Sequence, residues 1–510
     1  MSETVDGLLQ QADSETAPPF NAYEVAALIE SFGYNDRAVG RFGFSDVFAL
    51  GEYIFSRCRQ QPVSGPAEAS LHPAGARFRE LGSAMRKLSA SLAYSVPWMA
   101  LLALEYLRPK DLQVSPQLGA ASTLALIASL IAAGGFVQMI SRSGTFYFGL
   151  QEPVLARRSC VLLMNLGLIA SLFAALAGLI VGLYFHIFAG VYLVLAAATF
   201  VTLSLLWMLC AVLSAQGRSL YIPVIFVVSG CAAALVKVLA HSETSTVLMI
   251  GVLVAILCAL GCGVAGFYWT EKKAPGKDLS APPRLAVMVL SLLPFYLYGT
   301  AYFSFVFADR LVAGTAIPWA YGLNFGIDFA YKRGMDLVLL AFLITAALVE
   351  YLSDFFLRSW FKLAAQPYAS GDGVLSANLR TRHRRIVIMI LVVFLLISFV
   401  AGCVLGRVAG LFSSRVVLET AVLGGLGYLM LSVALFESII LASLNSVSPA
   451  LRAMALGLAV NLLIGYGLSH LLAVQYAGAG LLTGSAVVLW KCNAAVRQVL
   501  RHPDYHYATA

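Results

Sequence analysis

Apolar runs of about 20 residues or more follow one another along most of this chain of 510 residues, and twelve can be distinguished. A helix of about 20 apolar residues crosses the ~30 Å hydrocarbon core of a bilayer, so each run predicts one spanning helix. Only 12% of the residues are charged, whereas soluble proteins carry roughly 25%. The predicted fold class is therefore an all-α polytopic membrane protein with about 12 transmembrane helices.

The twelve predicted spans form two sets of six, separated by a polar cytoplasmic linker at 270–285. The first set covers 88–107, 118–140, 161–185, 187–213, 220–240 and 245–269. The second set covers 286–308, 334–357, 385–406, 416–442, 449–472 and 476–498. This division predicts two pseudo-repeated six-helix halves at 88–269 and 286–498. Internal repeats of this kind are frequent in transporters, where the substrate path lies between the halves.

The sequence before the first span has a different pattern of apolar residues. Residues 20–60 show helical apolar spacing, which predicts a small cytoplasmic helical module. Asn35 and Asp46 are suited to cap its helices. The module either docks a cytoplasmic partner or packs against the membrane domain. The remaining segments are a disordered tail at 1–19, a linker with a basic lead-in at 61–87 and a cytoplasmic tail at 499–510.

Lys and Arg are distributed unequally over the predicted loops. With the N-terminus inside, the cytoplasmic loops carry 15 of these residues and the opposite loops carry 7. Cytoplasmic loops are enriched in Lys and Arg, so both termini are predicted to be cytoplasmic. The net charge of +8 favours contact with membrane lipids. It does not predict nucleic-acid binding, because the cations lie between apolar runs and not on one basic face.

Sequence patterns that accompany catalysis are absent. The chain contains no phosphate-binding loop of the form GxxxxGK[ST], no HExxH, no CxxC and no credible nucleophile triad. Cys258 and Cys262 lie four residues apart, but no His or carboxylate stands beside them, so packing is favoured over metal binding. Nearly all the loops predicted on the outer side are also very short, and the longest is the hinge at 309–333. We therefore expect no enzyme activity, no cofactor and no metal site.

Charged residues in the seventh and eighth spans are the first candidates for a functional site. Asp309 and Arg310 stand near the end of the seventh span. Glu350, Asp354 and Arg358 step by four along the eighth span and so share one helix face. Charge in a membrane helix is costly and usually faces a bundle interior or a water-filled path. We expect these residues at gates or along a translocation path, although simple interfacial ion pairs would have the same pattern.

Proline and tyrosine residues in the first helix of each half are further candidates. Pro97 in the first span and Pro294 in the seventh each remove a helix hydrogen bond. Matched breaks of this kind favour a gating pair around a central cavity. Tyr298 and Tyr302 lie four residues apart, and their rings and hydroxyls are suited to contact sugars. Ordinary membrane-helix composition and aromatic packing would also account for these residues.

Two polar residues are predicted deep in the second half. Glu437 lies in the tenth span and Asn461 in the eleventh. A neutral, hydrogen-bonded Glu437 that couples neighbouring helices is favoured over a proton carrier, and Asn461 is assigned the same coupling role.

The C-terminal sequence from Phe436 to Trp490 resembles the closing helices of the MOP superfamily, which includes MATE-like transporters and polysaccharide flippases. The resemblance rests on a small-residue helix ending at Asn445, on Asn461 in the next helix, and on AGAG at 477–480. Within the superfamily, the segments YSVPWMALLAL, GFVQMISR and YGTAYFSFVFADRLVAG look most like the Pel-type exopolysaccharide exporters.

The resemblance implies a V-shaped bundle of two six-helix halves that opens alternately to the two sides of the membrane. Its cargo would be a polysaccharide or a lipid-linked oligosaccharide, exported during exopolysaccharide biosynthesis. Arg142, Asp309, Arg310, Glu350 and Asp354 would then be the best positions for the path and its gates. Two other hypotheses remain open: a cation-coupled drug or metabolite antiporter of the same superfamily, and a non-transporting scaffold for a glycosyltransferase.

Overall fold

A computed structural model describes most of the chain after residue 115 and parts of the chain before it. The described ranges are 22–31, 36–60, 116–240, 244–273, 285–317, 325–364, 372–409 and 414–501, with single positions between 85 and 96. The predicted tail at 1–19, the linker at 61–84, Asn35 and Pro97 lie outside these residues, as does nearly all of the predicted first span, 88–107. The chain divides into two compact units, one of residues 85–353 and 386–497 and one of the remainder.

Eleven helices in the described ranges are long and apolar enough to cross a membrane. Those of the first half are α6 (Pro116–Gly149), α7 (Pro153–Tyr184), α8 (Gly190–Ala215), α9 (Tyr221–Ala240) and α10 (Thr244–Lys273). Those of the second half are α11 (Leu285–Thr315), α12 (Phe329–Ala364), α13 (Asp372–Ala409), α14 (Arg415–Ser443), α15 (Val447–Leu471) and α16 (Ala477–Val499), with the short η3 (Val474–Tyr476) before α16. Each coincides with one predicted span, so the polytopic all-α prediction is confirmed.

Several boundaries were predicted wrongly, most clearly at α13. This helix begins at Asp372, 13 residues before the predicted start of its span at 385. The added turns contain the basic sequence RTRHRR, which hydropathy assigns to a loop. A helix continues beyond the hydrocarbon wherever its backbone hydrogen bonds can continue, so an apolar run marks only the part of a helix that lies in lipid.

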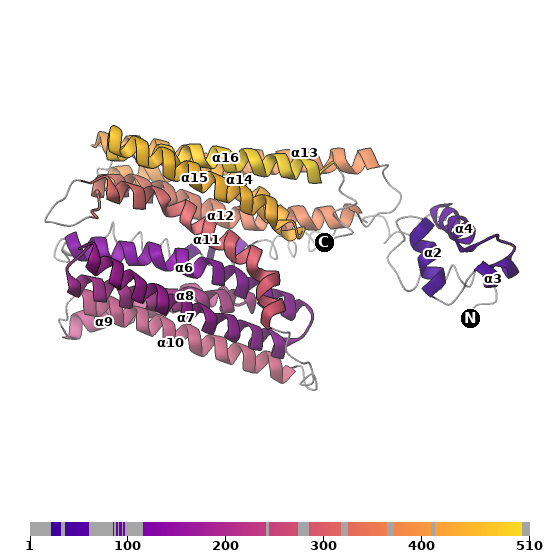
Figure 1. The fold of residues 1–510 in the computed structure, drawn as a ribbon, viewed down its shortest axis with the longest axis horizontal. Helices are drawn as coiled ribbons and strands as arrows, with labels where there is room; N and C mark the ends of the chain where they lie inside the picture. The colour runs from indigo at the N-terminus through magenta and orange to yellow at the C-terminus, as the bar shows by residue number, and fades with distance from the viewer. Residues whose placement is uncertain are drawn as a thin grey trace. The chain divides into compact units, whose positions relative to one another are not determined.

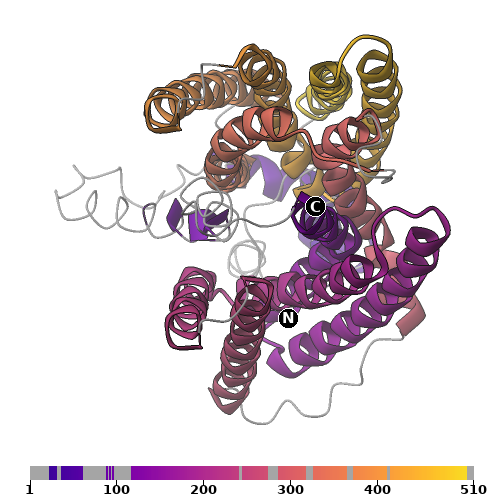
Figure 2. The same ribbon diagram turned by 90° about the vertical axis from the view of Figure 1, so that its left-hand side faces the viewer.

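The five helices α6–α10 lie together in one bundle, and α12–α16 lie together in another (Figure 1, Figure 2). Helix α11 joins the two, because it packs against α6 of the first bundle and α15 of the second. Pro294 lies inside α11, where it removes one backbone hydrogen bond. The first helix of the second half thus contacts both halves.

The crossing of α6 and α11 depends on glycines. A Cβ atom added at Gly299 of α11 would lie 2.5 Å from the carbonyl oxygen of Gly134 in α6. A Cβ atom at Gly134 would lie 3.2 Å from the carbonyl oxygen of Gly299. The two backbones are therefore in direct contact, as small residues permit in membrane helix pairs.

A separate small cluster of helices precedes the membrane helices. It contains α2 (Ala22–Ser31), α3 (Asp36–Val39), η1 (Gly40–Phe42) and α4 (Val47–Gln60). Its buried core includes Val25, Ile29, Leu50 and Ile54. The Asp46 carboxylate accepts a hydrogen bond from the Ala49 amide at 2.7 Å, which confirms it as the cap of α4 and lowers its pKa.

Candidate functional site

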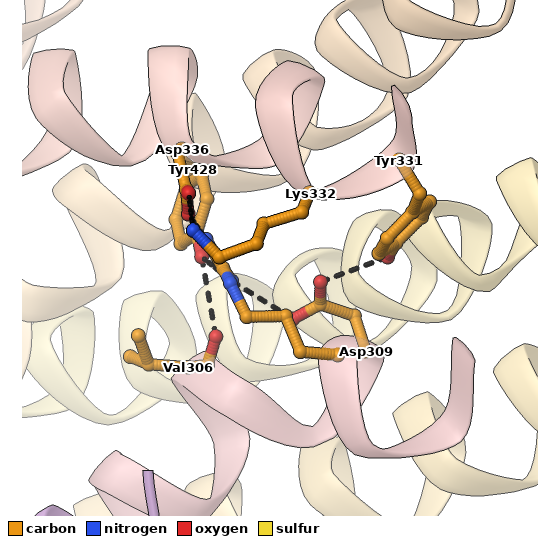
Figure 3. Close-up of polar contacts among 7 residues, drawn as sticks. Val306, Asp309, Tyr331, Lys332, Asp336 and Tyr428 are labelled. Carbon is orange, nitrogen blue, oxygen red and sulfur yellow. Dashed lines mark hydrogen bonds and ion pairs between the residues drawn. The ribbon is translucent and has the colours of Figure 1, made fainter. Parts of the chain in front are cut away.

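Asp309 is a carboxylate buried inside the membrane part of the second half. Its side chain on α11 has no exposed surface. The Tyr331 hydroxyl of α12 donates a hydrogen bond to one carboxylate oxygen at 2.8 Å, and Nη1 of Arg310 lies 3.4 Å from the other (Figure 3). Burial of an ionised group is tolerated only with such partners, so Asp309 depends on α12 as well as on its own helix.

Arg310 extends the contacts of Asp309 along α12 and to one further helix, α14. Its Nη2 lies 3.2 Å from Asp336 of α12, and its Nη1 donates a hydrogen bond to the Tyr428 hydroxyl of α14 at 3.0 Å. Tyr428 donates in turn to the Val306 carbonyl of α11 at 3.1 Å. Lys332 Nζ contacts the second oxygen of Asp336 at 2.6 Å. Figure 3 shows these side chains converging from three helices.

We call Asp309, Arg310, Tyr331, Lys332, Asp336 and Tyr428 the buried charge network. It holds two carboxylates and two cations, so its formal charge is zero. Between 0 and 12% of each charged side chain is exposed. Taking such charges out of water costs several kcal/mol per ion, which good geometry only partly returns. Buried ionisable groups in membrane helices usually mark a functional path.

The start of α12 is organised locally to place its part of the network. The Asp328 carboxylate accepts hydrogen bonds from the amides of Ala330 at 2.7 Å and Tyr331 at 3.1 Å. A carboxylate in this position satisfies amides that have no partner within the helix. Lys332 and Asp336 then lie one turn apart on the same face. The start of α12 and the four-residue spacing thus place Lys332 and Asp336 in the network.

A cavity of about 30 Å³ adjoins the network. Its walls include Arg310, Tyr331 and Lys332 from the second half and Thr123 and Ile127 from α6 of the first half. A cavity of roughly 10–15 Å³ already holds one water molecule, so this one has room for water or a small cation but not for a sugar. The network therefore lies at the boundary between the two halves.

An apolar cluster joins the halves beside this cavity, and we call it the apolar seal. Phe188, in the α7–α8 connection, is 4% exposed and packs with Ala120 and Leu193. Phe325 and Ile327 of the second half pack against the same cluster. The rings of Phe188 and Phe325 meet edge to face, with their centroids 6.4 Å apart. The halves are thus in contact at this end.

Sequence analysis assigned Asp309 and Arg310 to the path, but it did not assign the other members of the network. The four-residue spacing of Lys332 and Asp336 at the start of the eighth span was a readable signal for an ion pair. No signal in the sequence linked Tyr428 to Arg310, because 118 positions separate them.

The remaining predicted path residues lie elsewhere. Arg142 is exposed on α6 and lies 5.2 Å from the ring centroid of Phe295. Tyr298 and Tyr302 stack on each other along α11.

Glu350 is exposed on α12, about 21 Å along the helix from Asp336 at 1.5 Å per residue. Asp354 accepts a hydrogen bond from Arg358 at 3.0 Å in an exposed pair. The structure does not bring these residues into the network, and their assigned roles stay predictions.

Glu437 and Asn461 each connect two helices. The Asn493 amide of α16 donates to Glu437 of α14 at 2.6 Å, and the Asn461 amide of α15 donates to the Phe305 carbonyl of α11 at 3.2 Å. Both side chains are fully buried. These contacts agree with a coupling role but do not test whether Glu437 carries protons.

The structure assembles no metal centre in the part of the chain that it describes. Among those residues, no group of three or more His, Cys, Asp and Glu side chains could hold a metal ion. Cys258 and Cys262 are half-buried and pack against the hydrophobic core. The buried charge network itself is built from ion pairs and hydrogen bonds.

Comparison with known proteins identifies the fold. No family model matches the chain, and no curated protein does. The similar solved structures include a mutant MATE transporter VcmN of Vibrio cholerae (17% identity, TM-score 0.55, 83% of this chain and 98% of that one). The same transporter in the bent form is 18% identical, with a TM-score of 0.54 over 83% of this chain and 98% of that one.

A third similar structure is a multidrug resistance MATE family transporter of the MOP superfamily in an outward-facing conformation. It is 13% identical, with a TM-score of 0.57 over 84% of this chain and 97% of that one. These matches give no specific support for a Pel-type exporter. The chain has the fold of the MATE transporters of the MOP superfamily.

Proposed function

We propose that this protein is a transporter that exports a polysaccharide or a lipid-linked oligosaccharide across the bacterial inner membrane by alternating access. The observation that carries the proposal is the buried charge network at the boundary between the two halves. A fold used by transporters and a costly set of intramembrane charges beside a cavity are together best explained by transport. The proposed orientation has both termini in the cytoplasm.

The apolar seal gives this proposal a conformational step. Phe188 and Phe325 close the space between the halves at the end that the loop charges predict to face outward. Cargo cannot pass a cavity of about 30 Å³, so export requires the halves to separate there. Because the seal consists of a few apolar contacts without ion pairs of its own, it can open and close at modest cost.

The buried charge network would couple that opening to an ion. When the seal opens, water reaches Asp309 and Asp336. A proton or a cation then competes with the present partners of each carboxylate. A bound proton or cation would weaken the hold of Asp309 or Asp336 on Arg310. The free energy of ion binding would in this way shift the balance between the closed and open arrangements.

The proposed cargo is favoured by the sequence resemblance and by two stacked tyrosines of α11. Tyr298 and Tyr302 stack with their centroids 6.3 Å apart, so two adjacent rings and their hydroxyls lie on the helix that touches both halves. In the same proposal, residues 20–60 dock a cytoplasmic glycosyltransferase that supplies the cargo.

A cation-coupled antiporter is the second candidate. It is favoured by the two carboxylates of the buried charge network, and by the similar fold of a structure described as a multidrug resistance transporter. The two candidates differ in their cargo, so a secretion assay separates them.

The test measures secreted polysaccharide in cells that lack the gene and carry the parent, Asp309→Asn or Asp336→Asn at matched membrane levels. Glu419→Gln is the matched control, because Glu419 forms an ion pair with Arg415 at 2.6 Å outside the network. We expect both network variants to stop secretion while sugar–lipid precursors accumulate, and the control to secrete normally. Unchanged surface polysaccharide in the gene deletion would refute export and favour the antiporter.

A second comparison separates export from the scaffold hypothesis. A chain without residues 1–76 would lose all function if the protein only recruits a glycosyltransferase, whereas Asp309→Asn would then have no effect. Loss of secretion in Asp309→Asn therefore supports transport by the membrane helices.

A further inference from the structure

A pocket lined by two cations lies away from the buried charge network. It has a volume of about 400 Å³ and lies between the α8–α9 turn and the last turns of α10. Its lining residues are Arg218, Tyr221, Cys262, Ala265, Trp269 and Lys273. The four from α10 recur every three or four residues and so form one face of that helix. We call this the basic pocket.

The basic pocket carries positive charge without a counter-charge. Arg218 and Lys273 come from two different elements, and neither forms an ion pair with a carboxylate in the described ranges. The nearest carboxylate in sequence, Glu271, is occupied by Arg157 at 2.6 Å. Helix α9 begins at Tyr221, so the positive end of its dipole also lies at the pocket. This charge calls for an anionic occupant.

Arg218 is held in place by packing against α10. A Cβ atom at Gly266 would lie 2.8 Å from Nη1 of Arg218, so the guanidinium crosses the helix directly over this glycine. Gln216 lies over Gly266 as well, and its amide donates a hydrogen bond to the Gly263 carbonyl at 3.0 Å. The cation is therefore positioned before any ligand binds, which lowers the entropic cost of binding.

The surroundings of the pocket indicate that its occupant comes from the membrane. Tyr221 and Trp269 are 48% and 54% exposed, and such aromatic residues gather at the level of lipid headgroups. Val224 and Val228 of α9 follow Tyr221 on the same helix face and are exposed apolar residues. An anionic headgroup in the pocket could therefore extend its acyl chains over these residues.

We propose that the basic pocket binds the phosphate headgroup of an anionic phospholipid. The phosphate lies between Arg218 and Lys273, and the glycerol backbone lies against Trp269 and Tyr221. Basic pockets between membrane helices are suited to such headgroups. The loop charges place this site in the cytoplasmic leaflet. The proposal does not depend on the cargo, because no pocket residue belongs to the buried charge network.

The test titrates the purified, delipidated full-length chain in detergent micelles with phosphatidylglycerol and counts bound lipids by native mass spectrometry. We expect one tightly bound phosphatidylglycerol that phosphatidylcholine does not replace. The double variant Arg218→Gln/Lys273→Gln should weaken this binding about tenfold or more. Lys272→Gln, a cation adjacent to the pocket but outside its lining, should leave the affinity unchanged.

A charge-retaining variant and a competition experiment complete the test of lipid binding. The charge-retaining variant Arg218→Lys/Lys273→Arg should still bind the lipid, which shows that the pocket tolerates substitution. Glycerol phosphate, which has no acyl chains, should not compete; competition would assign the pocket to a free phosphate compound. Parent-like binding by the double Gln variant, an equal loss in Lys272→Gln, or loss in the charge-retaining variant would each overturn the proposal.

Discussion

At the residue scale, the position of Asp309 explains why its neighbours are polar. The carboxylate is fully buried and is held by a tyrosine of α12 and by Arg310, which itself contacts Asp336. Removal of one member of such a set leaves the others with unpaired charge or hydrogen-bonding groups. The stability of α11 against α12 and the proposed coupling function therefore depend on the same atoms.

The variant Asp309→Ala should lower the free energy of unfolding by about 3–5 kcal/mol, the usual cost of breaking a buried ion pair. Glu419→Ala is the matched control, because its partner Arg415 is largely exposed and exposed pairs contribute about 1 kcal/mol or less. Denaturation of both variants in detergent micelles measures the difference. Equal losses would show that the network contributes no more stability than a surface pair.

At the element scale, α11 is the helix on which the two halves meet. Its contact with α6 is a backbone approach at Gly134 and Gly299, and its contact with α15 includes the hydrogen bond from Asn461. A larger side chain at the crossing cannot be accommodated by a rotamer change, because the opposing atom belongs to the backbone. The α6–α11 crossing is therefore sensitive to a single methyl group.

The variant Gly299→Ala should destabilise the protein by about 1–3 kcal/mol, the usual cost of overpacking. Gly230→Ala on α9 is the control, since a Cβ atom there meets nothing within 4 Å and alanine favours helix more than glycine does. Melting temperatures of the two variants in the same detergent measure the effect. A tolerated Gly299→Ala would show that α6 and α11 can separate without cost.

The helices themselves could be predicted well from the sequence, whereas the site could be predicted only in part. Spanning helices follow from hydropathy, because the bilayer imposes length and apolarity on each one. Asp309 and Arg310 stood out because charge is rare in such runs. Tyr428 did not, because a tyrosine in a membrane helix is ordinary and its partner is set by helix packing. The basic α13 extension was missed because it lies beyond the apolar run.

At the scale of the whole molecule, a fold of two halves would confine the proposed transport to the surface between them. In the described residues that surface carries the buried charge network on one side, Thr123 and Ile127 on the other, and the apolar seal at its end. The proposed function gives the network and the seal different tasks. In that proposal, charge balance sets which ion stabilises an arrangement, and apolar contact sets how readily the halves separate.

The variant Phe325→Ala should therefore shift the protein toward an arrangement that is open at the seal. Its ring packs on Gly314 and meets Phe188, so truncation of this half-buried side chain removes apolar contact worth up to about 3 kcal/mol. The reporter is Ala121→Cys, introduced in a chain whose native cysteines are replaced by serine, since Ala121 is 1% exposed within the seal. A membrane-impermeant maleimide applied from outside should label it several times faster in Phe325→Ala than in the parent.

Phe399→Ala serves as the control for this labelling experiment, because its ring is 70% exposed on α13 and lies outside the seal. It should leave the labelling rate at Ala121→Cys unchanged. Faster labelling in Phe325→Ala alone would mean that apolar contact between the halves keeps this end closed. Equal rates in the parent and Phe325→Ala would mean that the buried charge network, and not the seal, holds the halves together, and that the opening step must begin at Asp309.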